Sequence, residues 1–266
     1  MLNKITVLFI GDIFGNLGLE LLKVHLPKLK TQFRPDFIIA NGENSAKNGR
    51  GMGKQAANEI FSVGVDCITL GNHTWRQQDI YDVIEKEQRI IRPANFPEGA
   101  PGRGFAIFSL SNYKIVVINI MGRSFISPQL DCPFIKINNI LAEIPEAIVI
   151  VDMHAETTSE KIALSWHLDG KVSAILGTHT HVQTSDERIL PQGTGYLTDV
   201  GMVGPYDGVI GLEPDGIIRR YLTQLPTKSV VAKGRGQFNA VLLEIDPLRR
   251  VTTSISRIRI NDDHPF

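Results

Sequence analysis

The most restrictive feature of the chain is a series of short apolar runs, each ending near a glycine or a polar residue. The runs are four to six residues long and rich in β-branched side chains, and they cover residues 5–10, 37–40, 67–70, 105–110, 115–120, 147–151 and 172–176. Runs of this length and composition are typical of strands that are buried on both faces of a sheet.

Segments with helical periodicity lie between several of these runs. They cover residues 17–33, 55–63, 79–86, 134–143 and 159–168. Pro27 lies inside the first of them, and we expect it to kink or break that helix. The alternation of strands and helices predicts a layered α/β fold. Glycine and proline predict loops at 93–103 and 190–216, and the end of the chain predicts a hairpin of strands 237–245 and 251–260.

Size and charge narrow the class of protein. The 266 residues are 42% hydrophobic, which excludes wholesale disorder and predicts a single domain spanning residues 1–266. The 28 basic and 28 acidic residues balance, which argues against a general binder of long polyanions but not against a small phosphate-bearing ligand.

No apolar stretch is long enough to cross a membrane and no signal-peptide pattern follows the first run, so we expect a cytoplasmic protein. With only two cysteines, a disulfide framework is excluded, while a single disulfide stays open.

Polar side chains gather where five of the predicted strands end. These residues are Asp12, Glu43, Asn44, Asn72, His73, His154, His179 and His181. Each one alone has an ordinary explanation, such as a turn, a helix cap or a buried histidine. Ligands of open α/β sheets bind beyond the carboxyl ends of strands, where this set would converge. In an extended segment His179 and His181 would point the same way and could reach two different metals. Carboxylate, amide and imidazole groups together predict a dinuclear metal site.

The order of these residues resembles that of calcineurin-like metallophosphoesterases, and in detail the bacterial YmdB-like branch. The resemblance rests on Gly11–Asn16, Asn41–Asn44, Gly71–Trp75, Gly177–Thr184 and Gly195–Met202, and it extends from Gly11 to about Gly211. It implies an α/β/α sandwich of two mixed β-sheets flanked by helices. The chain departs from the wider superfamily in two places, since Phe14 stands where a histidine is usual and Glu43 stands where the bridging aspartate is usual.

The resemblance also implies a role for each site residue. One metal would be held by Asp12, Glu43, Asn44 and His181, and the other by Glu43, Asn72, His154 and His179. Glu43 would bridge the two ions, and His73 would be the general acid or the hydrogen-bond donor to the transition state. Iron or manganese is favoured, and zinc and magnesium stay open.

The function implied is that of a metal-dependent phosphodiesterase. The expected substrates are small cyclic nucleotides, above all 2′,3′-cyclic nucleoside monophosphates, attacked by a hydroxide that bridges the metals. A phosphomonoesterase, a ribonuclease acting on RNA, and a regulatory protein with a ligand-sensing metal site are the alternatives. Family members assemble as homo-oligomers, so we expect the same here. Substrate-binding residues are not identified, although Asp199 and Tyr206 are candidates in the loop, and Arg50 and Arg123 lie in loops that could reach the site.

Overall fold

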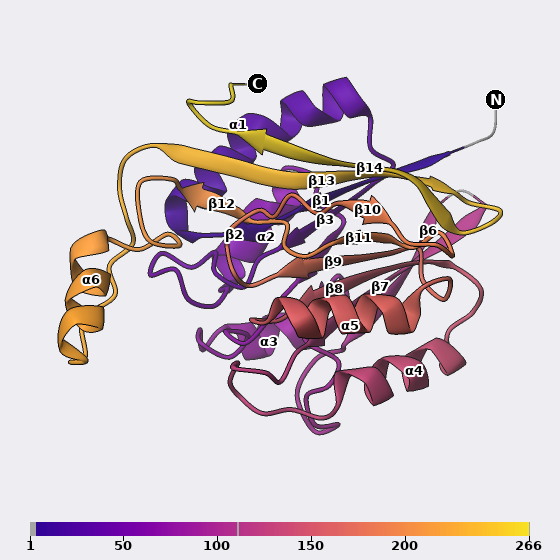
Figure 1. The fold of residues 1–266 in the computed structure, drawn as a ribbon, viewed down its shortest axis with the longest axis horizontal. Coiled ribbons are helices and arrows are strands. Elements are labelled where there is room, and N and C mark those ends of the chain that lie inside the picture. Colours follow the sequence, from indigo (N-terminus) through magenta and orange to yellow (C-terminus); the bar gives the residue numbers. More distant parts are fainter. Residues whose placement is uncertain (1–3, 111, 266) are drawn as a thin grey trace.

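Two mixed β-sheets pack face to face and carry helices on their outer faces (Figure 1). The structure is a computed structural model that describes residues 4–110 and 112–265; positions 1–3, 111 and 266 of the predicted domain lie outside the described residues. The layered architecture of two mixed sheets flanked by helices is therefore confirmed.

The first sheet has a parallel half and an antiparallel half. In the described part of the chain it contains eight strands: β1 (Ile5–Ile10), β2 (Asp12–Ile13), β3 (Phe37–Asn41), β4 (Cys67–Thr69), β5 (Ile90–Ile91), β12 (Met202–Pro205), β13 (Gly236–Asp246) and β14 (Val251–Ile260). Their order is β2-β12-β13-β1-β3-β4-β5, with β14 paired to β13. Strands β1, β3, β4 and β5 are parallel, so their carboxyl ends meet at one edge.

The second sheet is smaller and has its parallel strands at the centre. Within the described ranges it contains six strands: β6 (Phe105–Leu110), β7 (Tyr113–Met121), β8 (Ile148–His154), β9 (Ala174–Thr178), β10 (Arg188–Ile189) and β11 (Gly195–Leu197). Their order is β10-β11-β9-β8-β7-β6. Strands β7, β8, β9 and β11 at its centre are parallel, and β6 and β10 close the edges in antiparallel pairing.

Helices cover both outer faces. The helices are α1 (Gly15–Phe33), α2 (Lys54–Ser62), α3 (Ile80–Lys86), α4 (Pro133–Glu143), α5 (Thr158–Leu168) and α6 (Pro214–Thr223). Helices α1, α2 and α3 pack on the first sheet, and α4 and α5 pack on the second. Helix α6 stands away from the body at the left of Figure 1 and leaves Tyr221 and Leu222 mostly exposed.

Strand β1 shows why polar residues do not alternate with apolar ones in the apolar runs. Val7 and Phe9 point into the core between the two sheets, whereas Leu8 and Ile10 point into the core beneath α1 and α2. All four side chains are fully buried. Since complete burial of such a side chain stabilises the fold by about 1.5–3 kcal/mol, a polar residue at any of these positions would be costly.

Four sequence-based expectations change. Pro27 does not break α1, which continues through it, because the buried Leu22, Leu26 and Leu29 hold the helix on the sheet. The predicted 190–216 loop contains β11 and β12, which are too short and glycine-rich for periodicity to detect. Strand β8 extends to His154 and so contains a residue that we expected beyond its end. Cys67 and Cys132 are free thiols, which settles the open question of a disulfide.

Among the described residues, no helix combines the length and the apolar character needed to cross a bilayer.

Candidate metal centre

The site lies where the carboxyl ends of both sheets meet. Strand β2 supplies Asp12, and the turns after β3 and β4 supply Glu43 with Asn44 and Asn72 with His73. The second sheet supplies His154 from the last position of β8, and His179 and His181 from the turn after β9. Close polar contacts join all eight residues in one cluster. The polar residues at the predicted strand ends therefore do converge.

One half of the cluster is centred on the Nε2 atom of His154. This atom lies 3.1 Å from Oε1 of Glu43, 3.0 Å from Oδ1 of Asn72 and 3.1 Å from Nδ1 of His179. The donor atoms of Glu43, His154 and His179 all lie within 4.8 Å of one another, a spacing that could hold a metal ion.

The other half is centred on Asn44. Its side-chain nitrogen lies 3.2 Å from Oε1 of Glu43 and 3.1 Å from Nε2 of His181. The Nε2 atom of His181 lies 3.7 Å from Oδ1 of Asp12. In this rotamer the amide oxygen of Asn44 faces His73, so an oxygen ligand from Asn44 would require the amide to turn over.

The two histidines after β9 do not lie in an extended segment as expected. His179 and His181 have positive φ angles of 99° and 65°, so alternation along a strand does not place them. They nevertheless reach opposite halves of the cluster, His179 towards His154 and His181 towards Asn44. The turn achieves this because the buried carboxylate of Asp199 accepts hydrogen bonds from the backbone of Thr180 and Gly201.

Each of the three strand-end histidines is oriented by a polar contact on the side away from the cluster. His154 Nδ1 lies 2.8 Å from the Thr178 hydroxyl, and that hydroxyl donates to Asp152. His179 Nε2 lies 3.0 Å from a Glu156 carboxylate oxygen, and His181 Nδ1 lies 3.0 Å from the Ile210 carbonyl. With these N–H groups directed outwards, the remaining ring nitrogen of each histidine faces the cluster as metal-ligating histidines do.

Asp12 provides an independent indication that the cluster fits a cation. Its side chain is fully buried, and its Oδ1 atom has no hydrogen-bond donor among the described residues. Burial raises its pKa to about 6, although the nearby charges of His181 and His154 oppose this shift. A buried carboxylate oxygen without a partner is costly, and a divalent cation would satisfy it.

The charges of the cluster are strongly coupled. Burial opposes a charge on Glu43, but the charge and hydrogen bond of His154 hold the pKa of Glu43 well below its usual range. Burial would also lower the pKa of His154, yet the Glu43 carboxylate raises that pKa to about 9. Burial and the His154 charge lower the pKa of His179 to about 2. The His154 proton thus supplies the positive charge that a metal would supply.

His73 is held in place by its backbone N–H and by one of its two ring nitrogens. Its backbone N–H donates to Oε2 of Glu43 at 2.9 Å, and its Nδ1 atom lies 2.7 Å from Oδ1 of Asn44. Burial lowers the pKa of His73, while the Glu43 carboxylate acts in the opposite direction. A neutral His73 that donates from Nδ1 to Asn44 has an Nε2 atom that can only accept, whereas an Asn44 amide turned over would donate to Nδ1 and leave the proton on Nε2.

Four supporting residues were missed or misassigned from the sequence. Asp152 and Thr178 orient His154, and Glu156 orients His179. For Asp152 the sequence did contain a signal, because the spacing Asp152-x-His154 places both residues on one face of a strand. Asp199, a candidate for substrate contact, is instead fully buried and pairs with Lys161 at 2.7 Å. Its role is to hold the turn that carries His179 and His181.

Gly71 is required by the close approach of the two sheets. A Cβ atom at this position would lie 2.3 Å from both Oε2 of Glu43 and Nε2 of His154. The strand end after β4 can therefore meet the cluster only without a side chain.

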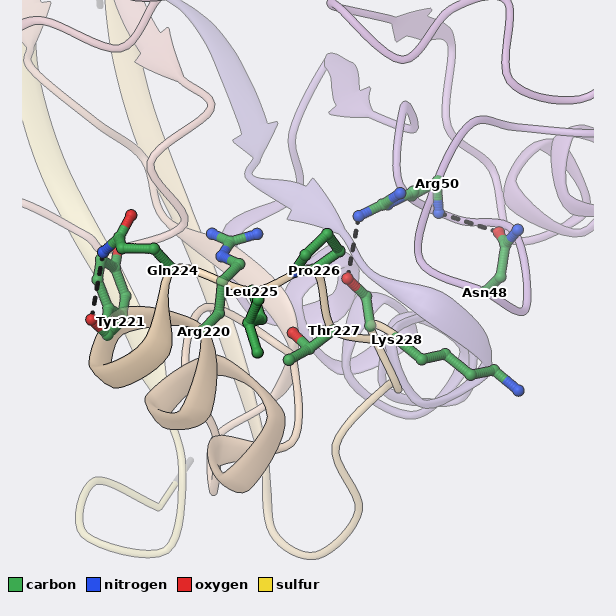
Figure 2. A pocket seen from close by; sticks show the side chains of 10 residues that line it. Asn48, Arg50, Arg220, Tyr221, Gln224, Leu225, Pro226, Thr227 and Lys228 are labelled. Atoms are coloured by element: carbon green, nitrogen blue, oxygen red, sulfur yellow. Dashed lines mark hydrogen bonds between the residues drawn. The ribbon is translucent and has the colours of Figure 1, made fainter.

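Two cavities are lined by predicted ligands, and a third is not. One of about 440 Å³ is lined by Asn72 and His179 together with Trp75, Arg76 and Phe125. One of about 230 Å³ contains His181 and the candidate Tyr206, whose hydroxyl donates to Asp263. Figure 2 shows a third, of about 900 Å³, between α6 and the loop after Asn44; it contains none of the predicted ligands, but it is lined by the cations Arg50, Arg220 and Lys228.

The chain is similar to known proteins over nearly its whole length. The family model described as YmdB-like protein matches residues 8–258. A Bacillus subtilis (strain 168) protein named 2′,3′-cyclic-nucleotide 2′-phosphodiesterase is 47% identical, and the alignment covers 98% of each chain. A Mycoplasma pneumoniae structure described as a novel phosphatase has a TM-score of 0.94 at 36% identity, covering 98% of this chain and 95% of that one. A structure from Thermus thermophilus, described as a hypothetical protein, has a TM-score of 0.92 at 40% identity, covering 97% and 99%.

Proposed function

The chain belongs to the YmdB-like protein family, and from that premise we propose that it is a metal-dependent phosphodiesterase that hydrolyses 2′,3′-cyclic nucleoside monophosphates. The observation that carries the proposal is the orientation of His154, His179 and His181. Each turns one ring nitrogen towards the buried carboxylates of Asp12 and Glu43 and fixes the other nitrogen from behind. Histidines fixed in this way are typical of metal sites.

We propose that the cluster holds two divalent ions, with iron or manganese favoured over zinc or magnesium. Asp12, Asn44 and His181 would hold one, Asn72, His154 and His179 would hold the other, and Glu43 would contribute to both. When bound, the ions would neutralise the phosphate and make hydroxide available near neutral pH. Nitrogen and oxygen donors without thiolate support these metals.

The protein groups have separate tasks in this reaction. Glu43 orients His73 through the backbone N–H of that residue, and the Asn44 amide lies against Nδ1 of the ring. With this amide turned over so that its oxygen serves as a metal ligand, its N–H group would donate to Nδ1. The proton of the neutral ring would then lie on Nε2, which can donate to the departing ribose oxygen. The outward contacts with Thr178, Glu156 and Ile210 keep the three other rings from turning.

Two enzymatic alternatives share the same core. A ribonuclease is favoured by one observation, the cations Arg50, Arg220 and Lys228 in the cavity beside the loop that follows Asn44. A phosphomonoesterase is the activity suggested by the description of the Mycoplasma pneumoniae relative. A regulatory, ligand-sensing protein is a third alternative, but a free donor such as His73 would have no use in it.

One assay separates these functions. Purified protein supplied with Mn²⁺ or Fe²⁺ is offered 2′,3′-cyclic AMP, 3′,5′-cyclic AMP, a phosphomonoester and single-stranded RNA. We expect hydrolysis of 2′,3′-cyclic AMP to exceed that of the others. The absence of hydrolysis of every phosphodiester would refute the proposal, and faster cleavage of RNA would favour the ribonuclease.

The proposal extends to the form and location of the protein. The core shared by β1, β3, β7 and β8 supports a single domain over residues 1–266. The unpaired thiols of Cys67 and Cys132 suit the reducing cytoplasm. A homo-oligomer stays a prediction, which light scattering of the purified protein would test.

A further inference from the structure

Phe125 is exposed beside the metal cluster to an extent that needs a physical explanation. Its side chain is 92% exposed, although the next residue, Ile126, is only 5% exposed. The backbone of Phe125 has a φ of 57°, a left-handed conformation that bulky residues rarely adopt. Exposure and strain are both unfavourable, and strain of this kind persists mainly where the surroundings enforce it for a function.

The loop that carries Phe125 is held firmly from both sides. The backbone N–H groups of Arg123 and Ser124 donate to the Glu160 carboxylate at 2.9–3.1 Å. The Gln129 amide donates to the carbonyls of Arg123 and Ile126 at 2.9 and 3.0 Å. These bonds fix the residues on either side of Phe125 and leave its ring outside.

The same loop is attached directly to the metal cluster. The Gly122 N–H donates to the His154 carbonyl at 3.0 Å. A Cβ atom on Gly122 would lie 2.5 Å from a Glu160 oxygen, so the anchoring carboxylate can approach only a glycine. The position of Phe125 is therefore tied to the position of a candidate ligand.

The cavity beneath Phe125 begins at the cluster and ends at aromatic surface. Asn72 and His179 line its inner end, and Trp75, Arg76 and Phe125 line the rest. Trp75 is fixed by stacking on Tyr81 at 5.2 Å between ring centroids. The volume of about 440 Å³ lies in the range of roughly 300–1,000 Å³ that is common for small-molecule sites.

We propose that Phe125 is the platform on which the nucleobase of the substrate stacks while its phosphate lies at the metal cluster. This inference rests on the proposed function, because it assumes a nucleotide whose phosphate is held by the predicted ligands. Stacking uses the face of the ring, which every base offers, so the platform recognises a nucleoside without selecting one base. Arg76, an exposed cation in the same lining, is positioned to add charge attraction for the phosphate.

The test compares two substrates that differ only in the base. One is 2′,3′-cyclic AMP and the other is 1-O-methyl-ribose 2′,3′-cyclic phosphate, which has no base. We expect Phe125→Ala to raise KM for cyclic AMP by about 5- to 150-fold, the range of measured base-stacking effects, with a much smaller change in kcat. KM for the base-free substrate should not change, and Phe125→Trp should behave as the unaltered protein does. Leu248→Ala, which removes another exposed apolar side chain in the turn between β13 and β14, is the matched control.

Two results would overturn the inference. One is an unchanged KM for cyclic AMP in Phe125→Ala. The other is an equal rise for both substrates, which would mean that the substitution disturbs the loop and not a contact with the base.

A binding measurement keeps the two proposals separate. Calorimetry of the metal-loaded protein with 3′-AMP and with methyl ribose 3-phosphate reports base recognition without turnover. If the protein hydrolyses no phosphodiester but binds 3′-AMP more tightly, and this preference is lost in Phe125→Ala, the proposed function fails and the platform stands. If neither ligand is preferred, the platform fails whatever the activity.

Discussion

At the scale of single residues, the candidate centre depends on protons that a metal would displace. In the described state Glu43 is held ionised beside a His154 whose pKa is raised to about 9 by that carboxylate, against the effect of burial. Asp12, which burial gives a pKa of about 6, has one oxygen without any donor among the described residues. The same buried charges therefore govern both metal affinity and pH response.

Metal affinity should follow the titration of His154. Because its pKa of about 9 means that the ring is protonated at neutral pH, a metal must displace that proton. The apparent dissociation constant should fall about tenfold per pH unit from pH 6 to pH 9 and level off above pH 9. Below the Asp12 pKa of about 6 the dependence should steepen, as a second proton competes. Calorimetry with Mn²⁺ in buffers of different ionisation enthalpy measures the protons released, and a release of zero at pH 7 would contradict this account.

His73 should matter for turnover and not for metal retention. His73→Ala keeps the backbone N–H that donates to Glu43, so we expect the metal content to be unchanged. Loss of the side-chain donor should lower kcat by about 10²–10⁴-fold, the usual effect of general acid–base groups. Asp12→Asn is the comparison, because it should lose metal. Elemental analysis beside steady-state kinetics distinguishes the two, and loss of metal in His73→Ala would show that its assigned role is wrong.

At the scale of elements, the turns after the strands are what bring the ligands together. The turn after β9 carries two histidines with left-handed backbones, and the buried Lys161–Asp199 pair holds it in place. The turn after β4 passes so close to the cluster that only Gly71 fits. Such turns store strain that the surrounding packing must support.

Breaking the buried ion pair should destabilise the fold strongly. In Lys161→Met, Asp199 loses its countercharge while fully buried, which typically costs about 3–5 kcal/mol in the free energy of unfolding. Urea denaturation measures this cost. Arg235→Met, which breaks the exposed pair with Asp207, is the matched control and should change the unfolding midpoint very little. Equal effects of the two substitutions would show that the Lys161–Asp199 pair does not support the turn.

Gly71→Ala should abolish metal binding. The added methyl group would displace Glu43 or His154 by contact at 2.3 Å, so we expect the metal content to fall at least as far as in Asp12→Asn. Gly99→Ala is the control, since a Cβ atom there meets nothing within 4 Å among the described residues. Normal metal content in Gly71→Ala would mean that the turn can move away without loss of the site.

At the scale of the whole molecule, the candidate centre joins the two sheets. The core between them is apolar, and the predicted ligands come from both, Asp12 and Glu43 from the first sheet and His154 and His179 from the second. A bound metal would thus link two layers that otherwise meet through apolar contacts. The balanced charge of the chain is compatible with this design, because the cations that attract phosphate would be bound ions that the sequence does not count.

Metal should therefore raise the thermal stability of the whole protein. A metal at 100 times its dissociation constant stabilises the folded state by about 2.7 kcal/mol. For a domain of this size the melting temperature should rise by roughly 5–10 °C. Differential scanning calorimetry before and after removal of metal with a chelator measures the shift. His154→Ala, which removes a predicted ligand of one of the two ions, should show a smaller shift, and a shift of the same size in that variant would place that metal elsewhere.

The sequence by itself determined most of the strands, the layered fold class and the identity of the candidate ligands. It could do so because burial on both faces leaves a continuous apolar run, as in β1, and because polar residues at strand ends are visible in one dimension. It missed β11 and β12, the continuity of α1 through Pro27 and the role of Asp199, since each of these depends on packing against distant segments.

Only the tertiary structure decided how the side chains of the predicted ligands are oriented. The oxygen atoms of Thr178, Glu156 and Ile210 lie against one ring nitrogen of each histidine and so select which nitrogen faces the cluster, and Glu156 and Ile210 carry no local signal of that role. The exposure of Phe125 also could not be predicted from the sequence, because its loop is held by Glu160, which belongs to α5. Orientation depends on partners far apart in the chain, and their meeting is a property of the folded molecule.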